Sequence, residues 1–147
     1  MELKDHDRPL NARGKRDAPV MAAKFLEQEK EQPVLISSTA KRAYATAVYF
    51  AKHLDIAKKA IIKESSLYHG YEEDFASVLF EQLESINSVM IFAHNPGLTF
   101  FANNYSEFSI NNVPTTGIFR IESTSDKWVD FFDNAKLTLF IYPKMFL

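Results

Sequence analysis

The segment Pro33–Ala43 reads PVLISSTAKRA, and it decides the fold class. Its short apolar run ends in Ser, which is typical of a buried parallel strand, and the Ala-rich stretch Lys41–Leu54 behind it favours a helix. A second unit of this kind follows downstream, with an apolar run at Ser88–Ala93 and a short helix predicted over Gly97–Asn104. Strands that alternate with helices predict an α/β fold with a mostly parallel sheet.

The remaining elements extend this alternation in both directions. Asn11 is the predicted N-cap of a helix from Ala12 to about Glu29, and Pro19 predicts a kink or a broken first turn in it. The other predicted elements are a short strand at Ala60–Lys63, a helix at Glu72–Ile86 with Leu83 on its apolar face, and strands at Gly117–Glu122 and Leu137–Tyr142 joined by a turn through Ser123–Asp126. We therefore predict one three-layer α/β/α domain over residues 1–147.

Composition excludes several classes of protein. The 147 residues carry a net charge of −2, so no positive excess points to nucleic acid or to an anionic membrane. The chain has 0 Cys, which excludes disulfides, cysteine-ligated zinc and the thiol phosphatases. No apolar run is long enough to span a bilayer, and Met1–Ala18 is too polar for a signal peptide, so a cytoplasmic protein is expected.

Two side chains that could bind an anion follow the two predicted strands. Arg42 lies in a first helical turn, where it can bind two phosphate oxygens at once, and His94 directly follows the second strand. Spacing alone leaves two interpretations equal: an anion site, or a solvated arginine and a structural histidine. His6 is interpreted as a surface residue, and Asp5-x-Asp7 lacks the further ligands that a metal would need.

Five motifs in order resemble a known family. They are DRPLNxxGKRDAP at Asp7–Pro19, ISSxAxRAxxTA at Ile36–Ala47, SLYH at Ser66–His69, HNPGL at His94–Leu98 and VPTTG at Val113–Gly117. Together they resemble the SixA-like branch of the histidine phosphatase superfamily, which is related to phosphoglycerate mutases. The resemblance implies that fold, and a phosphatase without metal or cofactor that acts through a phosphohistidine intermediate.

The resemblance also implies roles for four residues. Arg42 matches the phosphate-binding arginine of the second motif. His94 matches the second histidine of the family's phosphate pocket. Arg8 of the Arg-Pro-Leu motif resembles a further pocket residue. His69 falls where many relatives place an acidic proton donor, and two roles stay open for it: donating a proton or lining the pocket.

One defining motif of the family is absent. The family carries an Arg-His pair at the end of its first strand, and no Arg-His dipeptide occurs in this sequence. The chain as given therefore has no family nucleophile. We expect Met1 to fall inside the first strand-to-helix loop of the family, so that the domain is truncated at its N-terminus.

Three functional hypotheses follow. The preferred one is a phosphohistidine phosphatase that acts on a phosphorylated protein, monomeric when intact and without nucleic-acid or membrane partners. The second is a non-catalytic phosphate- or phosphoprotein-binding remnant. The third is a phosphatase of small phosphate esters. The absence of a long insertion between Thr46 and His94 favours a protein substrate over a small ester.

Overall fold

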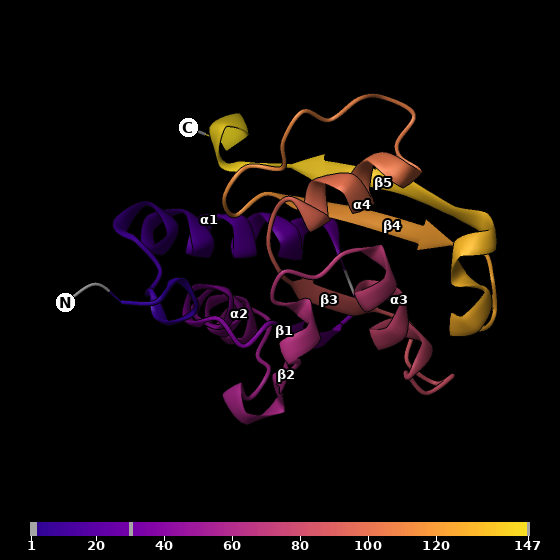
Figure 1. The fold of residues 1–147 in the computed structure, drawn as a ribbon, viewed down its shortest axis with the longest axis horizontal. Helices are drawn as coiled ribbons and strands as arrows, with labels where there is room; N and C mark the ends of the chain where they lie inside the picture. Colours follow the sequence, from indigo (N-terminus) through magenta and orange to yellow (C-terminus); the bar gives the residue numbers. More distant parts are fainter. Residues whose placement is uncertain (1–2, 30, 147) are drawn as a thin grey trace.

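A computed structural model describes residues 3–29 and 31–146 of the chain, with four α-helices and five β-strands (Figure 1). The helices are α1 (Ala12–Gln28), α2 (Lys41–His53), α3 (Glu72–Phe80) and α4 (Gly97–Tyr105). The strands are β1 (Val34–Ser37), β2 (Ile62–Lys63), β3 (Val89–Phe92), β4 (Ile118–Ser123) and β5 (Ala135–Ile141). The predicted α/β alternation is thereby confirmed.

The strands form two sheets. A parallel sheet has the order β2-β1-β3, and β4 pairs with β5 in an antiparallel hairpin. The prediction of a mostly parallel sheet in an α/β fold is confirmed. No ladder joins β3 to β4 in the described residues, so the strands divide into two sheets. Each sheet therefore ends in a strand with one unpaired edge.

Helices cover both faces of the parallel sheet, as predicted. On one face, Met21 and Phe25 of α1 and Phe50 of α2 pack with Leu35 of β1. On the other face, Phe75 of α3 and Phe101 of α4 pack around Ile36. Burial of apolar surface at about 25 cal/mol per Å² on both faces holds the three layers together.

Helix α1 begins as predicted but is not broken at Pro19. The Asn11 side chain accepts a hydrogen bond from the Gly14 amide at 2.8 Å, which makes Asn11 the N-cap. The helix continues through Pro19 to Gln28, so the predicted break in its first turn is wrong. Ala18 and Met21 are fully buried on either side of the proline, and their packing holds the helix in place.

Two predicted boundaries downstream are also wrong. Helix α3 ends at Phe80, and Leu83, expected on its apolar face, is 71% exposed. The β4–β5 connection is longer than the predicted turn and contains a 3₁₀ segment, Trp128–Asn134. Trp128 donates from Nε1 to the carbonyl of Ile86 at 2.9 Å, so this tertiary contact fixes the path of the chain after α3. None of the described helices is both long and apolar enough to cross a membrane.

Candidate active site

The C-terminal ends of β1 and β3 bring Ser38 and His94 together. The Ser38 amide donates to the Phe92 carbonyl, which continues the ladder one residue past β1. Beyond it, His94 Nε2 lies 2.7 Å from Ser38 Oγ, and Arg42 Nη2 lies 3.4 Å from His94 Nδ1. The predicted meeting of Arg42 with His94 at neighbouring strand ends is confirmed.

These contacts define the tautomer of His94. An arginine only donates hydrogen bonds, so Nδ1 accepts from Arg42 and the ring proton lies on Nε2, which donates to Ser38. Burial, followed by the positive charge of Arg42, lowers the pKa of His94 to about 4. His94 is therefore neutral near pH 7 in this arrangement.

The Asp5 carboxylate is hydrogen-bonded to Arg42. Arg42 donates from Nη1 to the Asp5 carbonyl at 2.9 Å and from Nη2 to its Oδ2 at 3.2 Å. Tyr68 donates its hydroxyl to the same Oδ2 at 2.6 Å. The Tyr68 hydrogen bond, with further contributions from Arg42, lowers the pKa of Asp5, and the same bond raises the pKa of Tyr68. The Asp5 carboxylate is thus an anion bound where the donors of Arg42 and Tyr68 meet.

The loop that carries His69 is held against the loop that carries His94. A Cβ added to Gly97 at the start of α4 would lie 1.8 Å from the Gly70 carbonyl oxygen, so only glycine allows this approach. His69 adopts a left-handed conformation with φ of 60°, and its ring lies 4.0 Å from that of Tyr68. Its charge is near enough to His94 to lower the pKa of that residue.

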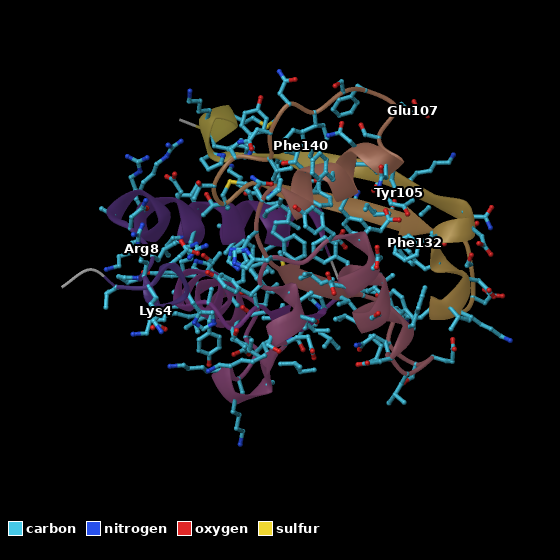
Figure 2. All side chains as sticks on the ribbon, in the orientation of Figure 1. Lys4, Arg8, Tyr105, Glu107, Phe132 and Phe140 are labelled. Carbon is cyan, nitrogen blue, oxygen red and sulfur yellow. The ribbon has the colours of Figure 1, made fainter. Side chains whose placement is uncertain are left out.

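His6 is part of the cluster, contrary to its interpretation as a surface residue. Its ring is only partly exposed, with Nε2 2.7 Å from Thr39 Oγ1 and its edge against Tyr68 at 4.9 Å. Arg8 is exposed and lies on the same N-terminal arm, close enough to Asp5 to contribute to its lowered pKa. Figure 2 shows Arg8 and Lys4 at this end of the molecule, beside α1 and α2.

Sequence analysis missed three members of the cluster. Asp5 was considered only as part of a metal pattern, and Tyr68 only as a member of the SLYH motif, so neither was predicted to contact Arg42 or its partners. Ser38 accepts from the Ala40 amide at 3.1 Å, as a capping residue does, and its hydroxyl also contacts His94. Among the described residues, no three His, Asp or Glu side chains are grouped to hold a metal ion.

The donors and the carboxylate bound to them make this cluster a candidate oxyanion site. The Arg42 guanidinium and the Tyr68 hydroxyl surround one oxygen of Asp5, and His94 lies against the same guanidinium. A guanidinium binds phosphate oxygens in the same two-pronged geometry as a carboxylate.

A comparison with protein families finds a match in the N-terminal half of the chain. A family model of the histidine phosphatase superfamily (branch 1) matches residues 3–69, which include Arg8, Arg42 and His69. No match was found among curated proteins.

Solved structures with similar folds cover nearly the whole chain. A candidate phosphohistidine phosphatase SixA from Agrobacterium tumefaciens is 25% identical, with a TM-score of 0.74, over 96% of this chain and 87% of that one. A second candidate SixA, from Nakamurella multipartitia, is 18% identical, with a TM-score of 0.72, over 97% of this chain and 89% of that one. The protein histidine phosphatase SixA complexed with tungstate is 17% identical, with a TM-score of 0.82, over 100% of this chain and 92% of that one. The chain is thus similar to the histidine phosphatase superfamily, through a family model over residues 3–69 and through its fold over nearly its whole length.

Proposed function

We propose that this domain is a phosphohistidine phosphatase of the SixA type, whose cluster binds the phosphoryl group of a phosphorylated protein. The observation that carries the proposal is the contact between Arg42 and His94 at 3.4 Å, with the Asp5 carboxylate bound to the same guanidinium. One structural neighbour is a protein histidine phosphatase complexed with tungstate, a tetrahedral oxyanion.

Each residue has a proposed part in binding the phosphoryl group. Arg42 takes two phosphoryl oxygens in place of Asp5, and Arg8 adds positive charge from the N-terminal arm. A phosphoryl dianion beside His94 favours its protonated form, so binding raises the pKa of His94 from its low value and adds a donor on Nδ1. Positive donors around three oxygens are what phosphoryl transfer chiefly requires, and they need no metal.

The nucleophile is proposed to come from a segment outside these 147 residues. In the proposed reaction a histidine attacks phosphorus, the P–N bond of the substrate phosphohistidine breaks, the departing imidazole takes a proton, and water then hydrolyses the enzyme phosphohistidine. His69, exposed at the rim of the cluster, is placed either to donate that proton or to line the pocket.

A second candidate function is non-catalytic binding of a phosphoprotein. It is favoured by the contacts of two histidines. Both ring nitrogens of His94 are occupied, by Ser38 and by Arg42, and those of His6 lie against Thr39 and Asp7. Neither ring therefore offers phosphorus a free attacking lone pair in this arrangement.

A protein substrate fits the cluster better than a small phosphate ester. Arg8 and His69 are exposed, and the Asp5 side chain is 54% exposed. A shallow, open site admits a phosphorylated side chain on a folded surface, whereas pockets for small ligands bury most of the ligand.

Oxyanion binding tests the role of Arg42. Titration calorimetry with tungstate compares the parent chain with Arg42→Ala and with Lys41→Ala, a matched control because Lys41 is the exposed neighbour on the same helical turn. Charge-assisted hydrogen bonds contribute about 1.5–3 kcal/mol, so Arg42→Ala is expected to weaken binding by about 10- to 150-fold. Equal affinities for the parent and Arg42→Ala would exclude Arg42 as a ligand.

Turnover measurements distinguish the phosphatase hypothesis from non-catalytic binding. The 147-residue chain and a version extended by an apolar strand that ends in Arg-His are incubated with a phosphohistidine protein, and released phosphate is measured. The phosphatase hypothesis expects turnover from the extended chain only. Binding without turnover by both chains supports the non-catalytic alternative. Turnover by the chain as given that is lost in His94→Ala would make His94 a nucleophile and overturn the proposed roles.

A further inference from the structure

A groove of about 440 Å³ lies along one face of α2, beside the oxyanion cluster. The α2 side chains that line its middle are Tyr44, Ala45, Val48 and Tyr49, whose spacing puts them on one side of the helix. All four are half-buried, whereas the side of α2 that faces the core is buried. Helix α2 therefore presents a second, partly apolar face to this groove.

Three lysines from three elements border the groove. They are Lys15 of α1, Lys41 of α2 and Lys58 of the 3₁₀ turn Lys58–Ala60, and all three are exposed. Among the described residues that line the groove, none is Asp or Glu. Within residues 3–29 and 31–146, no carboxylate lies within ion-pair distance of these three amines. The groove is thus positively charged, although the net charge of the whole chain is −2.

The ring of Tyr44 holds lysine side chains beside the groove. The ammonium nitrogen of Lys63 lies 4.3 Å from the centre of the ring, and that of Lys58 lies 6.0 Å from it. A cation over an aromatic face is attracted to it, and this contact restricts an otherwise flexible side chain. A lysine that is already restricted loses less conformational entropy when it binds a partner.

The groove begins where the oxyanion cluster ends. Lys41 lines the groove, and the next residue, Arg42, holds the Asp5 carboxylate in the cluster. Pro9 lines the groove and directly follows Arg8, which Figure 2 shows beside α1 and α2. A protein whose phosphorylated side chain is bound by Arg42 therefore has neighbouring surface over the groove.

We propose that this groove docks an acidic, amphipathic segment of the phosphorylated protein. That the partner is the phosphorylated protein rests on the proposed function, whereas the chemistry of the segment rests on the groove alone. The stretch of α2 from Lys41 to Tyr49 rises about 12 Å, at about 1.5 Å per residue, which matches about two turns of a bound helix. The segment places apolar side chains against Val48 and Tyr49 and carboxylates toward the lysines. The net negative charge of the chain disfavours a more extended anionic surface, such as a nucleic acid or a bilayer.

Three peptides and a pair of charge variants test the groove. The peptide EELEELLEELEE has one apolar face, LELLELEEEEEE has the same composition without such a face, and KKLKKLLKKLKK reverses the charge. The variant Lys58→Glu changes a lysine of the groove, and Lys59→Glu is its matched control, because Lys59 is the exposed neighbour that does not line the groove. Tyr49→Ala removes part of the apolar face. Calorimetry measures the affinity of each variant for the peptides and for tungstate.

The expected result is that one EELEELLEELEE binds per chain, at least about tenfold more tightly than either of the other peptides. An exposed ion pair changes affinity by about twofold to fivefold, and charge reversal adds repulsion, so Lys58→Glu is expected to weaken binding by about three- to twentyfold. Tyr49→Ala is expected to weaken binding as well, and Lys59→Glu to change it by about twofold at most. Tungstate binding is expected to be unaffected in Lys58→Glu and Tyr49→Ala, because the groove and the cluster are separate sites.

Several results would overturn the docking site. Equal binding of EELEELLEELEE and LELLELEEEEEE would show that the apolar face of α2 takes no part. Peptide binding that is lost in Arg42→Ala and retained in Lys58→Glu would place the peptide on the oxyanion cluster instead. A short DNA strand or phosphatidylserine vesicles that bind more tightly than the peptide, in a manner lost in Lys58→Glu, would assign the groove to another class of partner. Tungstate binding without any binding of EELEELLEELEE would overturn the docking site while leaving the proposed function in place.

Discussion

Replacing Ser38 with alanine tests the hydrogen bonding on which the cluster depends. Ser38 is fully buried, and its hydroxyl oxygen accepts from the Ala40 amide and from His94 Nε2. The substitution leaves two donors without an acceptor, and an unsatisfied buried donor costs about 1–3 kcal/mol. Ala40 is fully buried, whereas His94 retains access to water, so we expect a loss of about 2–3 kcal/mol in the free energy of unfolding.

Ser37→Ala is the matched control. Ser37 is as buried as Ser38, but its hydroxyl donates only to the Ser38 carbonyl at 2.8 Å and does not contact His94. One lost neutral hydrogen bond costs about 1 kcal/mol. At about 2–4 °C per kcal/mol, the two variants are expected to lose about 5–10 °C and about 2–4 °C in Tm.

Urea unfolding and ¹⁵N NMR of the histidine ring check this prediction. The Nε2 signal of His94 is expected to move in Ser38→Ala and to stay in place in Ser37→Ala. If the two variants are equally destabilised and the His94 signal is unchanged in both, Ser38 does not hold the ring and the assigned tautomer is wrong.

Three further predictions concern the same cluster. The pKa of His94 is about 4 in the folded state and about 6.5 in the unfolded state. Its contribution to stability is therefore present above pH 6.5 and is lost as the pH falls toward 4. The urea midpoint of the parent is expected to drop more over this pH range than that of His94→Gln. Gly97→Ala places a methyl group against the Gly70 carbonyl and is expected to cost about 1–3 kcal/mol in urea unfolding and to weaken tungstate binding, whereas retained stability would show that the two loops are not in contact. Asp5→Asn removes the carboxylate that competes for Arg42, so calorimetry is expected to show several-fold tighter tungstate binding, and weaker binding would mean that Asp5 helps to hold the anion.

The elements predicted from sequence were those whose signals are local. A helix N-cap such as Asn11 binds an amide three residues away, and an apolar run that ends in Ser is also a short-range pattern. For this reason α1, β1, α2 and β3 begin close to where they were predicted. The C-terminal end of α3 was missed, because Ile86, which follows the helix, is held by a hydrogen bond from Trp128, 42 residues further along the chain.

The contacts of the candidate site also fall into two groups, those that local sequence patterns predict and those that depend on tertiary packing. Arg42 and His94 could be placed together from sequence, because parallel strands carry the residues behind them to one edge of a sheet. The contact of Asp5 with Tyr68, 63 residues apart, and the contact of His6 with Thr39, 33 residues apart, depend on how the N-terminal arm packs over that edge. No spacing rule describes such packing.

The sequence by itself determined the family motifs, the order of strands and helices, and the absence of an Arg-His pair. Only the tertiary structure decided that the strands divide into two sheets, with apolar side chains and free peptide groups around the space between them. Propensity and periodicity act within a few residues along the chain, whereas strand pairing joins segments that are distant in sequence. Whether a strand edge such as that of β3 has a partner is therefore a property of the folded chain.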